Sequence, residues 1–295
     1  MNEQVKIQVS YDPKLEKVVL MELDFGSRIK LNNGVRIPVL GLGVYLSPPG
    51  RVTQHSVDYA LKSGYRLVDT AHFYRNERDV GKAVKQSGIS REDVFITTKL
   101  WNDDHGYDSA LHAFRRSLDE LGMDYIDLYL IHWPVAGLRN ESWKALTKLL
   151  KDKKTRAIGV SNYTIQHLKE LLELSDIVPA INQVEFHPFL YQEDLLRFCR
   201  EHNIQVEAYS PLARGHELRH PTLVAVARRY EKTTAQIMIR WGLQHGLVVI
   251  PKSVKEERII ENSKVFDFEI SKKNMDLLDS LSEDLHTAWD PTGMP

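Results

Sequence analysis

The chain has 295 residues, of which 42% are hydrophobic and 27% are charged, and its formal net charge is −1 at pH 7. Such a chain can bury a large core as one large domain or two small ones, and its small net charge gives no field that would attract nucleic acid or an anionic membrane. A single cysteine, Cys199, excludes a disulfide within the chain and argues against a cysteine-based zinc site.

These features favour a cytoplasmic protein in a reducing compartment. The first ten residues, MNEQVKIQVS, lack the apolar segment of a signal peptide. No apolar run approaches the roughly 18 residues that a membrane span needs. We therefore expect neither a membrane segment nor a nucleic-acid partner.

Residues 1–28 precede the regular part of the chain. The segment VKIQV (5–9) alternates and VVLMEL (18–23) is apolar, so an extra strand pair and a loosely ordered extension are both open interpretations. The next segment, 29–38, has Asn33-Gly34 between alternating apolar residues, which predicts a β-hairpin. Such a hairpin could close the N-terminal end of a barrel.

A pattern of a short apolar strand, a loop and an amphipathic helix repeats along the rest of the chain. The predicted strands are 39–44, 66–71, 94–101, 125–133, 155–162, 179–187, 205–212 and 247–253. Their apolar runs suit a parallel sheet that is covered on both faces. Gly64, Gly88 and Gly122 stand where helices should end.

Eight such units predict an α/β fold of the (β/α)8 TIM barrel type over residues 29–285, with an extra C-terminal helix in SKKNMDLLDSLSE (271–283) and an irregular tail over 286–295. The rival fold is a doubly wound open sheet. It usually has a GxGxxG phosphate-binding turn after its first strand, and GLGVYLSPPG (41–50) does not fit that pattern.

In such a barrel the reacting groups lie at the C-terminal ends of the strands. Strand 66–71 contains Asp69 and is followed by Tyr74, the next strand carries Lys99, and the one after it carries His132. Each residue alone is more often a solvated strand end or a satisfied core residue. Together, on three neighbouring strands, they indicate one site.

The four side chains suit proton transfer to an oxygen atom. A phenol with a pKa near 10 is a poor acid at neutral pH, and a nearby cation such as Lys99 should lower that pKa. Asp69 could compensate the lysine, and His132 could donate a hydrogen bond to a carbonyl oxygen. No nucleophile–base pair, glycosidase-type carboxylate pair or metal-ligand spacing is evident.

Several motifs of the chain resemble those of the aldo-keto reductase superfamily. They are GYRLVDTAHFYRNE, ITTKLW, LYLIHWP, IGVSN, INQVEFHP, YSPL and IPKSVKEERIIEN, and the resemblance covers about residues 29–285. The few residues between Pro134 and the next helix resemble the short-loop, microbial-type members, such as aldehyde, diketogluconate and prostaglandin F synthase-like enzymes.

The resemblance implies a catalytic tetrad of Asp69, Tyr74, Lys99 and His132, with Tyr74 as the proton donor. It also implies reversible hydride transfer between NADPH and a small aldehyde or ketone. The residues that it assigns to NADPH are Gly43, Val44, Ser161, Asn162, Gln183, Tyr209, Ser210, Leu212, Lys252, Ser253, Arg258, Glu261 and Asn262. Lys255 stands where many members have threonine, and its charge should favour NADPH over NADH.

Within this set, the carboxamide of the nicotinamide would meet Ser161, Asn162 and Gln183, and its ring would stack on Tyr209. The segment 210–212 would follow the pyrophosphate. Lys252, Ser253 and Arg258 would hold the 2′-phosphate, because lysine and arginine pair well with phosphate, and Glu261 and Asn262 would contact the adenine. Without the other motifs, the charged segment around Arg258 would be taken as a solvated helix start.

Tyr45, Trp101 and Trp133 are the expected aromatic walls of the substrate pocket, and packing under a loop is the alternative for each. Segment 213–220 and the tail around Trp289 are candidate lids. The role of His72-Phe73 is open. We expect a monomer.

Two other functions stay open from the sequence alone. One is an NADPH-binding redox sensor or regulatory subunit with little turnover. The other is a barrel lyase or isomerase that forms a Schiff base on Lys99.

Overall fold

The computed structural model describes residues 11–12, 17–18 and 23–294. Its main sheet has eight parallel strands in the order in which they follow along the chain. They are β5 (Leu42–Gly43), β6 (Leu67–Asp69), β7 (Phe95–Leu100), β8 (Ile126–Ile131), β9 (Thr155–Ser161), β10 (Ile181–Glu185), β11 (Gln205–Tyr209) and β12 (Val248–Val249). Each lies within one of the eight predicted segments, so the strand prediction is confirmed.

Contacts between the first and the last strand close this sheet. The Gly41 amide donates a hydrogen bond to the Val249 carbonyl at 2.9 Å. Isolated parallel bridges also join Leu40 to Val249 and Gly43 to Lys252. On its other side, Gly41 lies close to Leu67 of β6. A Cβ atom on residue 41 would lie 2.5 Å from the Leu67 side chain, so the close approach of these two segments requires glycine. The predicted (β/α)8 barrel is confirmed, and the open, doubly wound alternative is wrong.

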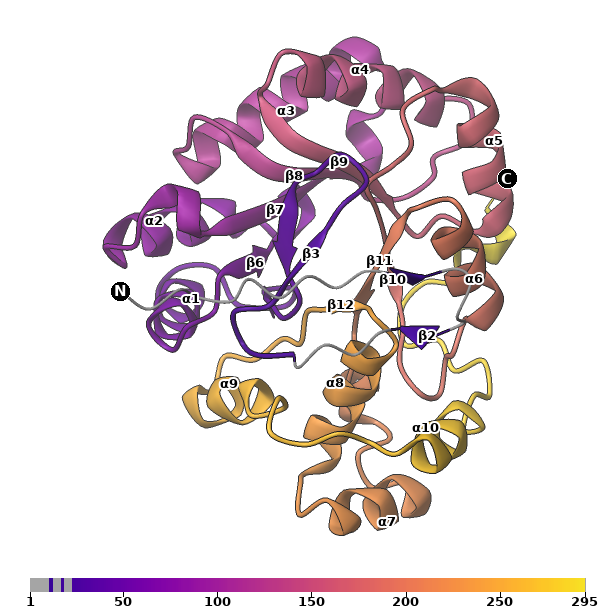
Figure 1. Ribbon diagram of the computed structural model, residues 1–295. Coiled ribbons are helices and arrows are strands. Elements are labelled where there is room, and N and C mark those ends of the chain that lie inside the picture. Colours follow the sequence, from indigo (N-terminus) through magenta and orange to yellow (C-terminus); the bar gives the residue numbers. More distant parts are fainter. Residues whose placement is uncertain (1–10, 13–16, 19–22, 295) are drawn as a thin grey trace.

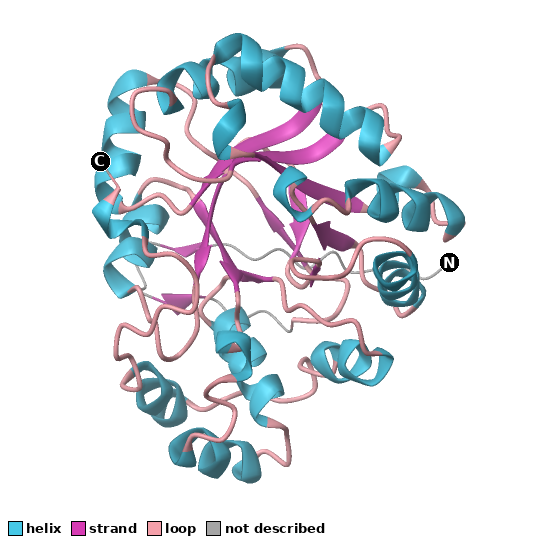
Figure 2. Cartoon of the chain, turned by 180° about the vertical axis from the view of Figure 1, so that it is seen from behind, coloured by secondary structure: helices cyan, strands magenta, loops and turns pink. Residues whose placement is uncertain are grey.

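Helices surround the strands as an outer ring (Figures 1 and 2). In the described part of the chain they are α1 (Arg51–Lys62), α2 (Glu77–Gln86), α3 (Tyr107–Leu121), α4 (Arg139–Lys151), α5 (Ile165–Leu174), α6 (Glu193–Glu201), α7 (Pro221–Arg229), α8 (Thr234–Gln244), α9 (Glu256–Ser263) and α10 (Lys272–Asp279). Every residue of β7 and β8 is buried, because the ring covers the outside of the barrel and side chains fill its inside. The predicted C-terminal helix is α10.

The predicted hairpin lies across the N-terminal end of the barrel, in front of the strands in Figure 1. It consists of β3 (Arg28–Lys30) and the antiparallel β4 (Arg36–Pro38). Its turn is fastened to the barrel by Asn32, whose Nδ2 donates to the Pro179 carbonyl at 3.0 Å, and by Asn33, whose Nδ2 donates to the Arg156 carbonyl at 3.0 Å. These carbonyls lie at the starts of β10 and β9, so the hairpin leaves the C-terminal rim open.

Two short strands, β1 (Tyr11–Asp12) and β2 (Lys17–Val18), pair antiparallel before the hairpin. The strand expected at 5–9, and most of that expected at 18–23, lie outside the described residues. At the other end, the tail has one 3-10 turn, Pro291–Gly293. No helix in the described part of the chain has the length and apolarity needed to cross a membrane.

Candidate active site

A cavity of about 850 Å³ lies at the C-terminal rim of the barrel. Its lining comes from the ends of the barrel strands, from the loops that follow them, and from the tail. Asp69, Tyr74 and His132 all line it. The parallel sheet places these three residues together because the C-terminal ends of neighbouring strands meet at one edge.

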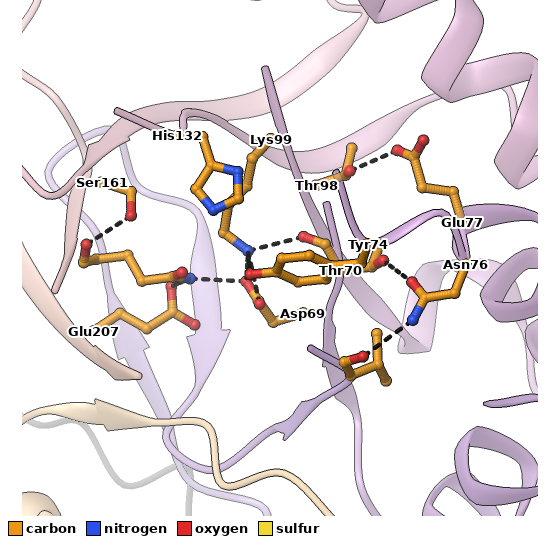
Figure 3. A network of polar contacts seen from close by, with 12 residues as sticks. Asp69, Thr70, Tyr74, Asn76, Glu77, Thr98, Lys99, His132, Ser161 and Glu207 are labelled. Atoms are coloured by element: carbon orange, nitrogen blue, oxygen red, sulfur yellow. Dashed lines mark hydrogen bonds and ion pairs between the residues drawn. The ribbon is translucent and has the colours of Figure 1, made fainter. Parts of the chain in front are cut away.

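Lys99 forms the charged centre of this site. It is fully buried, and its Nζ donates to both carboxylate oxygens of Asp69 at 2.7 and 2.8 Å and to the Thr70 carbonyl at 2.8 Å (Figure 3). The parallel register of β6 and β7 puts the two partners on adjacent strands. A buried ammonium group needs such a partner, because burial alone would favour its neutral form.

Tyr74 lies beside this ion pair, with its hydroxyl 3.4 Å from Lys99 Nζ. The expectation of a lowered pKa for Tyr74 is wrong for this structure. Burial raises the pKa of Tyr74 well above its ordinary value, and the Asp69 carboxylate raises it further. The charge of Lys99 is already matched by Asp69, so Tyr74 keeps its proton at neutral pH and has one to give.

His132 faces Tyr74, with 5.7 Å between the ring centroids and an interplanar angle of 75°. Burial, together with the charge of Lys99, lowers the pKa of His132 well below its ordinary value, so the imidazole is neutral. Backbone hydrogen bonds hold His132 in place. The His132 backbone amide donates to the Leu100 carbonyl, and the His132 backbone carbonyl accepts from Asn162 Nδ2 at 3.0 Å. A neutral imidazole can donate a hydrogen bond to a carbonyl oxygen.

Two buried polar residues position the loop that carries Tyr74, and neither has a role among the sequence predictions. Asn76 accepts from the Thr70 hydroxyl at 2.7 Å and donates from Nδ2 to the Val44 carbonyl at 3.0 Å. Glu77 accepts from the Thr98 hydroxyl at 2.6 Å (Figure 3). The available signal was a polar Asn-Glu pair one residue after Tyr74, in which Asn76 precedes α2 and Glu77 begins it.

A cluster of amide and hydroxyl groups lies next to His132. Ser161 donates to the Gln183 carbonyl at 2.8 Å, and the Tyr209 hydroxyl donates to Asn162 Oδ1 at 2.8 Å. Gln183 Nε2 donates to Asp69 Oδ2 at 2.7 Å. All four side chains line the cavity, and their donors and acceptors suit a carboxamide.

The far end of the cavity is cationic. It is lined by Lys252, Ser253, Lys255 and Arg258, which lie between the end of β12 and the first turns of α9. Among the residues assigned to NADPH from the sequence, Gly43, Ser210, Leu212, Glu261 and Asn262 also line the cavity. Val44 does not, because its side chain is fully buried in the core.

Residues 233–235, before and within the first turn of α8, line this end as well, and they were missed from the sequence. Thr233 donates from its hydroxyl to Glu261 at 2.6 Å, which joins α8 to α9. Thr233 and Gln236 also form a capping box. That capping motif marks a helix start, but it does not reveal which cavity the helix start meets.

Aromatic rings form the opposite end. Tyr45 lies 4.9 Å from Tyr74 between ring centroids, and Phe73 stacks on Trp101 at 3.8 Å and 16°. Phe73 therefore lines the cavity, whereas His72 turns toward Glu77, with Nδ1 3.3 Å from its carboxylate.

The C-terminal tail completes this wall. Trp289 lies 5.5 Å from Trp133 between ring centroids, and both line the cavity. Thr287 and Ala288 donate their backbone amides to Glu185 at the end of β10. From segment 213–220, Arg214, Gly215 and Leu218 also line the cavity, so both candidate lids border it.

Fold and cavity define a class of protein: a (β/α)8 barrel enzyme whose buried ionisable groups meet at the C-terminal rim. A model of the aldo/keto reductase family matches residues 51–283. The chain belongs to this family of oxidoreductases.

Similar proteins agree with this assignment. Glyoxal reductase from Bacillus subtilis (strain 168) is 50% identical over 263 residues, which cover 89% of this chain and 95% of that protein. The 9,11-endoperoxide prostaglandin H2 reductase from Trypanosoma cruzi (strain CL Brener) is 48% identical over 266 residues, which cover 89% of this chain and 94% of that protein. The crystal structure of a Bombyx mori aldo-keto reductase in complex with NADP matches with a TM-score of 0.84 at 34% identity and covers 90% of this chain and 95% of that one.

Proposed function

We propose that this protein reduces small aldehydes and ketones to alcohols with NADPH, reversibly, and that Asp69, Tyr74, Lys99 and His132 carry out the proton chemistry. The observation that supports this most strongly is the buried Lys99–Asp69 pair with the Tyr74 hydroxyl 3.4 Å from Lys99 Nζ, at the rim of an open cavity. Such a cluster serves to transfer a proton at a fixed place.

The donor set of the cavity fits NADPH. One end offers the hydroxyl and amide groups of Ser161, Asn162 and Gln183 to a carboxamide, and the other offers Lys252, Lys255 and Arg258 to a phosphate. A cavity of about 850 Å³ that joins these two ends suits an extended dinucleotide. When bound, this cofactor supplies the hydride. Three cations at the phosphate end should favour NADPH over NADH.

The residues of the chain supply the proton and the orientation. Tyr74 holds a proton and donates it to the substrate oxygen as the alcohol forms. Lys99 then stabilises the phenolate that remains, because an ammonium group close to the hydroxyl favours its charged form. His132, as a neutral donor, holds the carbonyl oxygen beside Tyr74.

The test is a Tyr74→Phe variant, measured for NADPH oxidation with an aromatic aldehyde and for NADPH binding by fluorescence titration. We expect turnover to fall by about 100-fold or more, because a positioned general acid contributes roughly that factor, while NADPH binding is retained. Tyr129→Phe is a matched control, since Tyr129 is fully buried in β8 and its hydroxyl has no hydrogen-bond partner within the described residues. Full activity in Tyr74→Phe would disprove the assignment of the acid, and no turnover by the unmodified protein over a wide carbonyl panel would favour an NADPH sensor instead.

A further inference from the structure

Glu207 is a buried ionisable group that the proposed reaction does not use. It lies on β11, directly opposite Gln183 of β10 in the parallel register, and it is 0% exposed. One carboxyl oxygen accepts a hydrogen bond from Gln183 Nε2 at 3.1 Å. The other, Oε1, has no hydrogen-bond partner within the described residues.

Gln183 joins Glu207 to the proposed tetrad. Its amide nitrogen has two N–H groups, one directed to Asp69 Oδ2 at 2.7 Å and one to Glu207. The reverse orientation would place the amide oxygen against the Asp69 carboxylate, which offers no donor, and would lose that hydrogen bond. Asp69 therefore fixes which way the Gln183 amide points, and Glu207 accepts its second N–H. Gln183 lines the cavity where we propose that the nicotinamide binds.

The charges around Glu207 do not balance if it is ionised. Three ionisable groups interact electrostatically with Glu207: Asp69, Lys99 and Tyr74. The neighbouring strand β12 adds no charge, because the residues that pair with β11 are both valines. Lys99 already holds both oxygens of Asp69. An ionised Glu207 would be a second buried anion without a cation of its own, which is costly in an interior of low polarity.

The pKa of Glu207 follows from the same surroundings. Burial raises the pKa of Glu207, and Asp69 raises it further, while the Gln183 hydrogen bond and Lys99 oppose the change; the result is a pKa of about 8. At neutral pH the group is then mostly a neutral carboxylic acid.

We propose that Glu207 is a positioning residue that stays protonated and holds the Gln183 amide, and through it the Asp69 carboxylate, in the geometry that the reductase site needs. This inference rests on the proposed function, because the geometry matters for NADPH binding and proton transfer. Strand β11 then has a second role in the site, besides the proposed contact of Tyr209 with the cofactor.

The consequence is a dependence on alkaline pH. When Glu207 loses its proton, its charge competes with Asp69 for Lys99 and raises the pKa of Tyr74. A carboxyl group with a raised pKa in the folded state stabilises the fold at low pH, and this contribution is lost as the pH rises toward about 8. Stability should therefore fall between about pH 4.5 and 8 and level off above that range, whereas catalytic efficiency should fall as the pH passes about 8.

The first experiment detects the proton on the Glu207 carboxyl group directly. Infrared spectra of the unmodified protein at pH 7 should contain a carbonyl band of a buried carboxylic acid, and Glu207→Gln should lack it. Glu185→Gln is the matched control, because Glu185 is also a buried glutamate, at the end of the neighbouring strand β10. Burial works against its ionisation, but hydrogen bonds from His187, Thr287 and Ala288 outweigh this and lower the pKa of Glu185. The band should survive in Glu185→Gln, and its survival in Glu207→Gln instead would overturn the proposal.

The second experiment measures the positioning role. For the unmodified protein we expect kcat/KM to fall near pH 8 between pH 6 and 10. Glu207→Gln keeps a neutral group of the same shape, so this fall should be absent from the variant. Glu207→Ala removes the acceptor of the Gln183 amide and should weaken NADPH binding by about fivefold, the value of one neutral hydrogen bond. An unchanged alkaline fall in Glu207→Gln, or unchanged NADPH binding in Glu207→Ala, would contradict the role.

The infrared and fluorescence measurements need no turnover. If the unmodified protein reduced no carbonyl compound, the proposed function would fail, but the protonation state of Glu207 and its effect on NADPH binding could still be tested.

Discussion

At the level of single residues, the site depends on one buried ion pair. Lys99 is 0% exposed in its side chain and Asp69 is 3% exposed, so neither charge is shared with water. A pair of this kind contributes little net stability, but removal of one partner leaves the other charge buried alone. The Lys99–Asp69 pair therefore makes the site both sensitive to mutation and fixed in geometry.

We predict that Lys99→Met lowers the free energy of unfolding by about 3–5 kcal/mol, because Asp69 loses its counterion. Urea denaturation followed by circular dichroism measures this change. Lys62→Met is the matched control: its partner is Asp58 at 2.7 Å, but the Lys62 side chain is 62% exposed, and an exposed pair is worth about 0–1 kcal/mol. The double variant Lys99→Met/Asp69→Asn should recover part of the loss, and no recovery would show that the cost has another origin.

At the level of elements, the position of Tyr74 depends on how α2 packs. Asn76 precedes this helix and Glu77 begins it, so the helix and the loop before it move together. On its other side, α2 contacts the end of α3 through Gly81. A Cβ atom at Gly81 would lie 1.9 Å from the Leu121 carbonyl oxygen, which is backbone and cannot turn away.

We predict that Gly81→Ala destabilises the protein by about 3 kcal/mol through overpacking, although alanine is a better helix former than glycine by about 1 kcal/mol. Gly122→Ala is the control. That residue has a φ of +62° with open space around its Cβ position, so only backbone strain of about 1 kcal/mol applies. Chemical denaturation compares the two, and a stabilised Gly81→Ala variant would show that α2 and α3 separate at little cost.

At the level of the whole molecule, the aromatic wall of the cavity is assembled from distant parts of the chain. Phe73 follows β6, Trp101 follows β7, Trp133 follows β8, and Trp289 comes from the tail. Trp289 is 64% exposed, so a substrate ring could cover its remaining surface. The tail packs on the aromatic wall, where Trp289 lies beside Trp133, so we expect its effect to be confined to the carbonyl substrate.

We predict that Trp289→Ala raises KM for an aromatic aldehyde by about fivefold, because an aromatic contact is worth roughly 1 kcal/mol beyond its buried area, and that it leaves NADPH binding unchanged. Steady-state kinetics with both substrates varied test this. Leu174→Ala is a matched control, since Leu174 is also 64% exposed but ends α5 and does not line the cavity. Equal KM values in the two variants would exclude Trp289 from substrate binding.

The sequence by itself determined the barrel, the order of its strands and the four residues proposed for proton transfer. The reason is that hydrophobic periodicity and turn residues act locally, and a parallel barrel brings all C-terminal strand ends to one rim. Asp69, Lys99 and His132 could thus be placed together before any contact was known. The family motifs supplied the residues proposed for NADPH, of which only Val44 is not among the cavity lining.

Only the tertiary structure decided contacts between segments that are far apart in the chain. Asp69 and Gln183 are 114 residues apart, and nothing in either segment encodes that one amide bridges Asp69 and Glu207. The structure also decided that Phe73 rather than His72 lines the cavity, and that burial and Asp69, not Lys99, govern the pKa of Tyr74 in this state. Burial and side-chain contact are properties of the packed molecule, because each depends on several elements at once.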